Sequence, residues 1–200
     1  MVPDAVFLDM DGTLVDTEGL WWQAAASVAA SLGRPLSPAD APHVHGRTVE
    51  DVAAYLGAPG TARPLTAAFA DLIGRDLTIM PGALELLSGL AATTIPTALV
   101  SASPQSIVDL VLPRLGHTFD LVIANEDTAR GKPWPDPYLE AARRLGATPA
   151  RCVAVEDSPT GIAAARAAGC RVLVVSEGLP SLLQICAYEG DCGENPREES

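Results

Sequence analysis

Short apolar runs alternate with helical patterns along most of the chain. The runs that predict strands are Ala5–Leu8, Thr97–Val100, Leu121–Ala124, Cys152–Val155 and Arg171–Val175. Most of them are apolar at every position, as in parallel strands that are covered on both faces. The helical patterns between them are Ala83–Ala91, Gln105–Leu115, Tyr138–Leu145 and Thr160–Ala168. This alternation predicts an α/β fold with a doubly wound, mostly parallel sheet.

The stretch between the first strand and Pro81 breaks the alternation, because it contains no convincing strand pattern. Its helical patterns begin with the spacing of Trp21 and Val28 and continue at Val49–Leu56 and Thr66–Asp76. We therefore expect a small helical lobe that is inserted directly after the first strand and its loop. Such a lobe would lie over that loop and act as a lid. A lobe that only adds bulk is the alternative.

These patterns divide the chain into three parts. Residues 1–15 and 81–177 are expected to form the α/β core, residues 16–80 a helical cap, and residues 178–200 a C-terminal tail. The tail ends in a polar stretch with Gly, Asn and Pro that cannot bury itself, so we expect it to be poorly ordered.

Composition restricts the partners that such a protein can have. The 200 residues are 48% hydrophobic and carry a formal net charge of −12, which argues against a nucleic acid or an anionic membrane as partner. No stretch approaches the roughly 18 apolar residues of a membrane-spanning helix, and the start of the chain lacks the pattern of a signal peptide. We expect a cytoplasmic monomer whose four cysteines, too scattered for a zinc pattern, are reduced thiols.

Two carboxylates stand at the end of the first predicted strand, in Asp9-Met10-Asp11-Gly12. Strand side chains alternate between faces, so Asp9 and Asp11 are expected on one side where the strand becomes a loop. Ligands of open α/β sheets bind outside the carboxyl ends of the strands, which favours a chemical role for this pair. Asp in an ordinary turn is the alternative.

Further polar residues follow other strands, toward the same expected edge of the sheet. Ser101 and Ala102 precede a predicted helix, whose free N–H groups favour an anion. Lys132 stands between Gly and Pro and suits a phosphate. Glu156 and Asp157 follow an apolar strand, where adjacent acidic residues need a cation, and Mg²⁺ prefers such oxygen ligands. Taken singly, a pre-helix turn, a surface lysine and a helix cap are the alternatives.

Together these segments resemble the four ordered signatures of the haloacid dehalogenase superfamily: Asp9-Met-Asp11-Gly-Thr13, Ser101-Ala-Ser, Gly-Lys132-Pro and Glu156-Asp157-Ser-Pro. The resemblance covers about residues 4 to 176 in the right order, and four motifs are far more specific than one. The helical insertion resembles the small cap that follows the first signature in that superfamily. Within it, the chain is similar to the phosphosugar phosphatase and β-phosphoglucomutase branch, nearest to 2-deoxyglucose-6-phosphate and hexitol phosphatases.

This resemblance implies a Mg²⁺-dependent phosphatase that hydrolyses a small phosphorylated metabolite, a sugar or polyol phosphate, in two steps. Asp9 would attack phosphorus and form an aspartyl-phosphate, and Asp11 would act first as acid and then as base. The implied metal ligands are Asp9, the carbonyl of Asp11, Asp157 and, through water, Glu156. The implied phosphate and substrate ligands are Thr13, Ser101, Ala102, Lys132 and, in the cap, Arg47.

The same resemblance leaves other functions open. A β-phosphoglucomutase would return the phosphate to a sugar, but there Thr13 is typically replaced and a cap histidine stands near the place of Trp21. Both departures favour hydrolysis. A dehalogenase is disfavoured, because it uses the first Asp without a metal. A catalytically silent binding or regulatory protein is a further alternative, although every expected catalytic position is filled.

Overall fold

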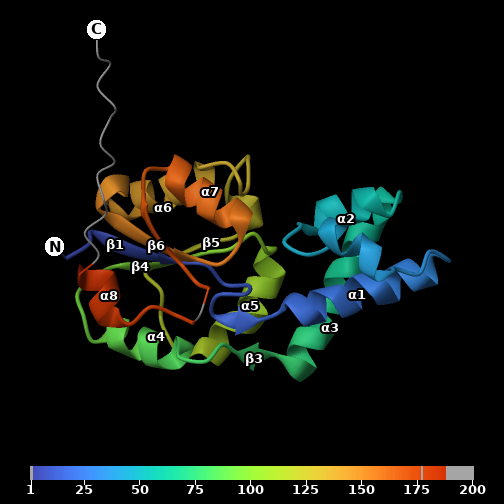
Figure 1. Cartoon of the computed structure of the whole chain (residues 1–200), viewed down its shortest axis with the longest axis horizontal. Coiled ribbons are helices and arrows are strands. Elements are labelled where there is room, and N and C mark those ends of the chain that lie inside the picture. Colours follow the sequence, from blue (N-terminus) through green and yellow to red (C-terminus); the bar gives the residue numbers. More distant parts are fainter. Residues whose placement is uncertain (1, 177, 188–200) are drawn as a thin grey trace, which may run out of the picture.

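A five-stranded sheet forms the centre of the protein, whose computed structural model describes residues 2–176 and 178–187 (Figure 1). Its strands are β1 (Ala5–Leu8), β4 (Thr97–Val100), β5 (Leu121–Ile123), β6 (Cys152–Glu156) and β7 (Arg171–Val174). The order across the sheet is β5-β4-β1-β6-β7, and every neighbouring pair is parallel. The predicted fold class is confirmed, and each strand begins at the predicted residue.

Helices cover both faces of the sheet, as strands that are apolar on both sides require (Figure 1). One face carries α6 (Asp136–Leu145) and α7 (Pro159–Ala167), and the other carries α4 (Ala83–Ala91), α5 (Gln105–Leu115) and α8 (Leu182–Ala187). Side chains that alternate along β1 divide the core between these layers. Phe7 packs with the layer of α6 and α7, whereas Val6 and Leu8 pack with the other layer.

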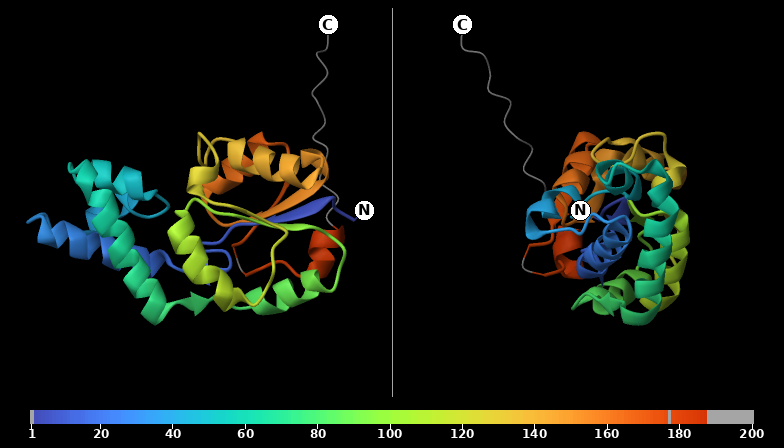
Figure 2. Two further views of the ribbon diagram at one scale, coloured as in Figure 1. Left: turned by 180° about the vertical axis from the view of Figure 1, so that it is seen from behind. Right: turned by 90° about the vertical axis from the view of Figure 1, so that its right-hand side faces the viewer.

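A helical lobe lies beyond the end of the sheet where β1 leaves it (Figures 1 and 2). It consists of α1 (Glu18–Ser31), α2 (Val49–Tyr55) and α3 (Ala62–Asp76). Short 3₁₀ segments in the described residues are Pro38–His43, Pro59–Thr61, Asn125–Asp127 and Pro149–Arg151. Within the described part of the chain, no helix is long and apolar enough to cross a membrane.

A two-stranded antiparallel ribbon joins the lobe to the core. It pairs β2 (Val15–Asp16) with β3 (Thr78–Ile79), so that the chain enters and leaves the lobe side by side. Sequence analysis predicted no strand here, because a strand of two residues is too short to show a period. The ribbon therefore sets the position of the lobe in a way that the hydrophobic pattern did not reveal.

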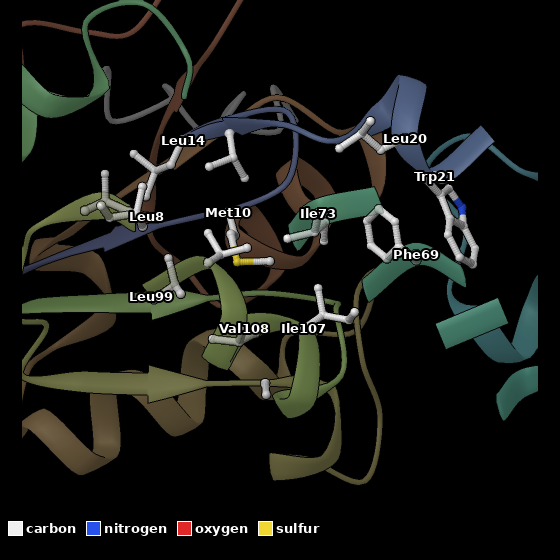
Figure 3. Packing of buried hydrophobic residues seen from close by; sticks show 14 of the residues in the cluster. Leu8, Met10, Leu14, Leu20, Trp21, Phe69, Ile73, Leu99, Ile107 and Val108 are labelled. Atoms are coloured by element: carbon white, nitrogen blue, oxygen red, sulfur yellow. The ribbon is translucent and has the colours of Figure 1, made fainter. Parts of the chain in front are cut away.

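The hydrophobic core runs without interruption from the sheet into the lobe (Figure 3). Leu8 and Met10 lie at the sheet, Ile73 of α3 lies between the two parts, and Phe69 and Trp21 belong to the lobe. The rings of Trp21 and Phe69 meet edge to face, with their centroids 5.2 Å apart. Burying each such side chain stabilises the fold by about 1.5–3 kcal/mol. The lobe is therefore packed on the core as well as tethered to it.

The C-terminal segment differs in part from the prediction of a poorly ordered tail. Leu182–Ala187 form α8, in which Ile185 is fully buried. Leu182 packs against α4 at Gly89, where an added Cβ would lie 3.3 Å from the leucine side chain. The expectation is wrong for this stretch, because its apolar residues find a surface on α4 that no local pattern reveals. Residues 188–200 lie outside the described residues.

The buried thiols yield a test of the core. Burial raises the pKa of Cys152 to about 11 and that of Cys170 to about 12, whereas Cys186 on α8 is partly exposed. Because alkylation requires an accessible thiolate, iodoacetamide at about pH 8 should leave Cys152 and Cys170 unmodified in the native chain. Peptide mapping by mass spectrometry measures this, with the guanidinium-unfolded chain as the control. Native Cys152 that reacts as fast as Cys186 would contradict the packing described here.

Candidate active site

The loops after β1, β4, β5 and β6 meet at one edge of the sheet, because all these strands run in the same direction. A cavity of about 380 Å³ lies between these loops and the helical lobe. The predicted site residues that line it are Asp9, Asp11, Arg47, Ala102, Lys132 and Asp157. The other predicted residues, Thr13, Ser101 and Glu156, are buried beside them. The structure thus brings all nine into one region.

Lys132 is the centre of the polar network. Its ammonium donates to Asp9 Oδ1 at 2.6 Å, to the carbonyl of Val100 at 2.9 Å and to Glu156 Oε1. Its three protons thus meet three acceptors, while only 3% of the side chain is exposed. Burial by itself would lower the pKa of Lys132, but the charges of Asp9 and Glu156 outweigh it and raise that pKa. This residue, the only lysine of the chain, is a permanent cation.

The two carboxylate oxygens of Asp9 have different surroundings. Oδ1 accepts from Lys132, whereas within residues 2–176 and 178–187 no hydrogen-bond partner reaches the buried Oδ2. Burial and the charge of Glu156 raise the pKa of Asp9 well above its usual value, and Lys132 opposes them. A buried carboxylate oxygen without a partner is costly, which indicates a ligand at this place.

A cation fits the residues around this free oxygen. Asp9, Glu156 and Asp157 each offer an oxygen, and these ligand atoms all lie within 4.8 Å of one another. Burial and the charge of Glu156 also raise the pKa of Asp157. Carboxylates this close together repel each other unless a cation lies between them. Mg²⁺ prefers oxygen ligands of this kind.

Glu156 is held from both sides and is completely buried. Oε1 accepts from Lys132 and, at 2.5 Å, from the hydroxyl of Tyr138, and Oε2 accepts from Ser158 at 3.2 Å. Ser158 also caps α7, because its hydroxyl oxygen accepts from the N–H of Gly161 at 3.0 Å. The sequence does not mark Tyr138 as a site residue, since an aromatic residue in an apolar helical pattern indicates only a core position.

Asp11 is surrounded by hydroxyl groups. Thr17 donates to Oδ1 at 2.7 Å, and Ser103 and Ser101 donate to Oδ2 at 2.8 and 3.3 Å. The sequence pattern marks neither Thr17 nor Ser103 as a site residue. Thr17 precedes α1 and resembles an ordinary helix cap, but its hydroxyl is used by Asp11. Asp11 is therefore oriented by the loop after β4 and by the entry to the lobe.

Thr13 and Gly12 shape the position of Asp157. The buried hydroxyl of Thr13 donates to Asp157 Oδ1 at 3.1 Å, whereas sequence analysis expected this hydroxyl to bind phosphate oxygens. Gly12 has a φ of +81°, and a Cβ at this position would lie 2.2 Å from Asp157 Oδ2. Only glycine therefore allows the loop after β1 to approach the carboxylate so closely.

The lobe contributes the opposite wall of the cavity. Arg47 lines it and is exposed, and its Nε donates to the carbonyl of Pro42 at 3.3 Å. His45 and Glu18 line it as well, with His45 Nδ1 2.5 Å from Glu18 Oε1. A cationic side chain and a polar pair thus face the acidic edge of the sheet, a mixed surface that suits a small polar ligand.

Comparison with known proteins agrees with this geometry. Residues 3–169 match the family of haloacid dehalogenase-like hydrolases. Hexitol phosphatase B of Escherichia coli (strain K12) is 34% identical over 183 residues, which cover 86% of this chain and 82% of that enzyme. CbbY from Rhodobacter sphaeroides, crystallised in complex with phosphate, has a TM-score of 0.79 at 29% identity and covers 93% of this chain and 91% of its own.

A β-phosphoglucomutase from Clostridium difficile also has the fold, with a TM-score of 0.75 over 88% of this chain and 85% of that one. At 22% sequence identity, this likeness shows the fold alone. The fold by itself therefore does not distinguish a phosphatase from a mutase, and the residues of the cavity must do so.

Replacement of Gly161 by Ala tests how closely the Glu156 carboxylate packs against the backbone of α7. A Cβ at Gly161 would lie 1.9 Å from Glu156 Oε1 and 2.1 Å from its Cδ, so the carboxylate must move away from Lys132. We expect Gly161→Ala to destabilise the fold by about 1–3 kcal/mol. Gly74→Ala is the matched control, because Gly74 lies in α3 with nothing near its Cβ position and should stabilise slightly. Urea unfolding measures both, and equal effects would contradict the close contact.

Mg²⁺ should stabilise the chain, and more at about pH 8 than at about pH 5. The folded-state pKa values of Asp9 and Asp157 are raised. In the metal-free chain, the stability that their protonated forms provide is lost as the pH rises through those values, and bound metal then restores it. Melting temperatures in MgCl₂ and in EDTA measure this at both pH values.

Asp157→Asn should abolish most of the effect of Mg²⁺, because it removes the charge of an oxygen donor next to Asp9. Asp71→Asn on the exposed side of α3 serves as the control and should retain the effect. A melting temperature that Mg²⁺ leaves unchanged at both pH values would argue against a metal at these carboxylates.

Proposed function

The chain belongs to the haloacid dehalogenase-like hydrolases, and on this basis we propose that it hydrolyses a small phosphate monoester, a sugar or polyol phosphate. One observation carries the proposal. Asp9 lines the cavity with one oxygen bound to the Lys132 ammonium and the other without a protein partner in the described structure. The likeness to hexitol phosphatase B supports a polyol or sugar phosphate as the substrate class.

Asp9 is the proposed nucleophile. Its free carboxylate oxygen attacks phosphorus, the bond to the leaving alcohol breaks, and an aspartyl-phosphate forms, which water then hydrolyses. The contact with Lys132 fixes the carboxylate in one orientation, which lowers the entropic cost of the attack. The same ammonium offsets negative charge as the phosphoryl group approaches.

Asp11 is the proposed acid and base. It protonates the leaving alcohol in the first step and takes a proton from the attacking water in the second, so that one group serves both steps. Its hydrogen bonds with Thr17 and Ser103 keep it on the wall of the cavity, two residues from the nucleophile. If one of these hydrogen bonds broke, a carboxylate oxygen of Asp11 would be free to face the substrate.

The proposed metal is Mg²⁺. Asp9, Asp157 and the backbone carbonyl of Asp11 would hold it, with Glu156 contributing through water. When bound, it reduces the repulsion between the carboxylates and a phosphate and stabilises charge on the transferred group. Thr13 contributes by orienting Asp157 through its 3.1 Å hydrogen bond.

The phosphate is proposed to lie near Lys132 and the turn of Ser101 and Ala102 before α5. Ala102 lines the cavity, and Ser101 lies just behind it, where its oxygen accepts from the N–H of Ser103 at 2.9 Å. Backbone N–H groups at such a turn suit an anion. Arg47 on the opposite wall would contact the rest of the substrate.

The position of Trp21 favours hydrolysis over mutase chemistry. Its indole N–H donates to the carbonyl of Val44 at 2.9 Å, and its ring packs on Phe69. An indole in this place offers no basic nitrogen to assist attack by a sugar hydroxyl. His45, which also lines the cavity, is paired with Glu18.

A screen of sugar and polyol phosphates with Mg²⁺ tests the proposal by release of inorganic phosphate. We expect turnover by the wild type and a loss of more than about thousandfold in kcat for Asp9→Asn, which removes the nucleophile. Asp76→Asn is the matched control, because it changes an exposed carboxylate at the end of α3, and it should retain wild-type activity.

The same screen separates the alternatives. Turnover of no phosphate ester, or full activity of Asp9→Asn, would refute the phosphatase. Interconversion of β-glucose 1-phosphate and glucose 6-phosphate with little release of phosphate would instead identify a mutase.

A further inference from the structure

We propose that Tyr138 is a positioning residue that holds Lys132 against Asp9 through Glu156. The role concerns the reaction of the proposed phosphatase and rests on that function. Tyr138 lies on α6, six residues after the lysine that it orients, and none of the four signature motifs contains it.

The contacts of Tyr138 reach both members of the buried ion pair. Its hydroxyl donates to Glu156 Oε1 at 2.5 Å, the same oxygen that accepts from Lys132. Its ring lies beside the ammonium, with Lys132 Nζ 5.5 Å from the ring centroid. Phe7 of β1 supports the ring from the side, at 6.1 Å between centroids. The tyrosine is thus fixed by the core, and it meets the site at Glu156 and Lys132.

The hydroxyl of Tyr138 affects how strongly the Lys132 ammonium is held by Glu156 and how strongly by Asp9. Glu156 and Asp9 compete for Lys132, and a neutral donor on Glu156 Oε1 reduces the negative charge that this oxygen presents to the lysine. Without that donor, Glu156 would attract the ammonium more strongly, and the contact with Asp9 would loosen. A tyrosine hydroxyl ordinarily keeps its proton at neutral pH, so this donor is neutral.

A purely structural role would need only the ring. The ring fills the core between α6 and β1, and Phe would fill it equally well. The hydroxyl, in contrast, is buried against a buried carboxylate, an arrangement that is costly unless it is fully hydrogen-bonded. The contribution of Tyr138 that we infer is therefore carried by its oxygen and can be removed without removing the ring.

The chain offers a matched pair of variants. Tyr138→Phe removes the hydroxyl next to the site, and Tyr55→Phe removes a tyrosine hydroxyl that donates to Asp40 in the lobe. With Mg²⁺ and the best ester of the screen, we expect kcat of Tyr138→Phe to fall about tenfold while KM changes less than about twofold. Tyr55→Phe should leave both constants unchanged. Circular dichroism and melting temperatures verify that both variants are folded.

A second measurement does not depend on activity. Because Lys132 is the only lysine, protein labelled with [¹⁵N]lysine should show one side-chain ammonium signal in NMR spectra. Its protons should exchange with water slowly in the metal-free wild type, since three acceptors hold them. Tyr138→Phe should speed this exchange about tenfold or more, whereas Tyr55→Phe should not change it.

The outcomes are distinct. Wild-type kcat or wild-type ammonium exchange in folded Tyr138→Phe overturns the proposal, and so does an ammonium that exchanges in the wild type as fast as free lysine. This last result needs no variant. If no phosphate ester is turned over but the exchange responds as expected, the positioning of Lys132 holds and the phosphatase function fails.

Discussion

One buried ammonium holds the polar centre of this protein together. Lys132 contacts Asp9 after β1, the carbonyl of Val100 at the end of β4, and Glu156 at the end of β6. Three strands are thus linked at one point, in surroundings where an unpaired charge would be costly. Lys132 offsets part of the charge of the three clustered carboxylates, and an excess of negative charge remains beside it. That excess favours a cation at the carboxylates, and a bound cation would in turn favour the proposed phosphate beside it.

The sheet makes this convergence possible. β1 lies in the middle of the order β5-β4-β1-β6-β7, so its carboxyl end is flanked by those of β4 and β6. Two glycines then allow backbone and carboxylates to approach closely, Gly12 beside Asp157 and Gly161 beside Glu156. In both cases a methyl group would occupy the space of a carboxylate. Catalytic geometry of this kind depends on close backbone approach as much as on the reactive side chains.

The lobe completes the cavity without contributing to the acidic cluster. It is joined to the core by the ribbon of β2 and β3 and packed on it through a continuous hydrophobic cluster. Thr17, at the start of α1, connects the two parts chemically, because its hydroxyl binds Asp11. A movement of the lobe would therefore change the position of Asp11, the proposed acid and base. The cavity wall that is proposed to contact the substrate is thus linked to Asp11 through Thr17.

Local patterns in the sequence determined the strands, most helices and the approximate place of the site, because apolar periodicity and the direction of parallel strands require no knowledge of distant contacts. The proposed roles of Asp9, Asp11 and Lys132 follow from motif and resemblance. Tertiary structure alone decided which hydroxyl meets which carboxylate. No local pattern predicts that the hydroxyl of Thr13 donates to Asp157, or that Tyr138, part of a core pattern, donates to Glu156. Such contacts join residues far apart in the chain, and a side chain's partner depends on the packing of the elements that carry it.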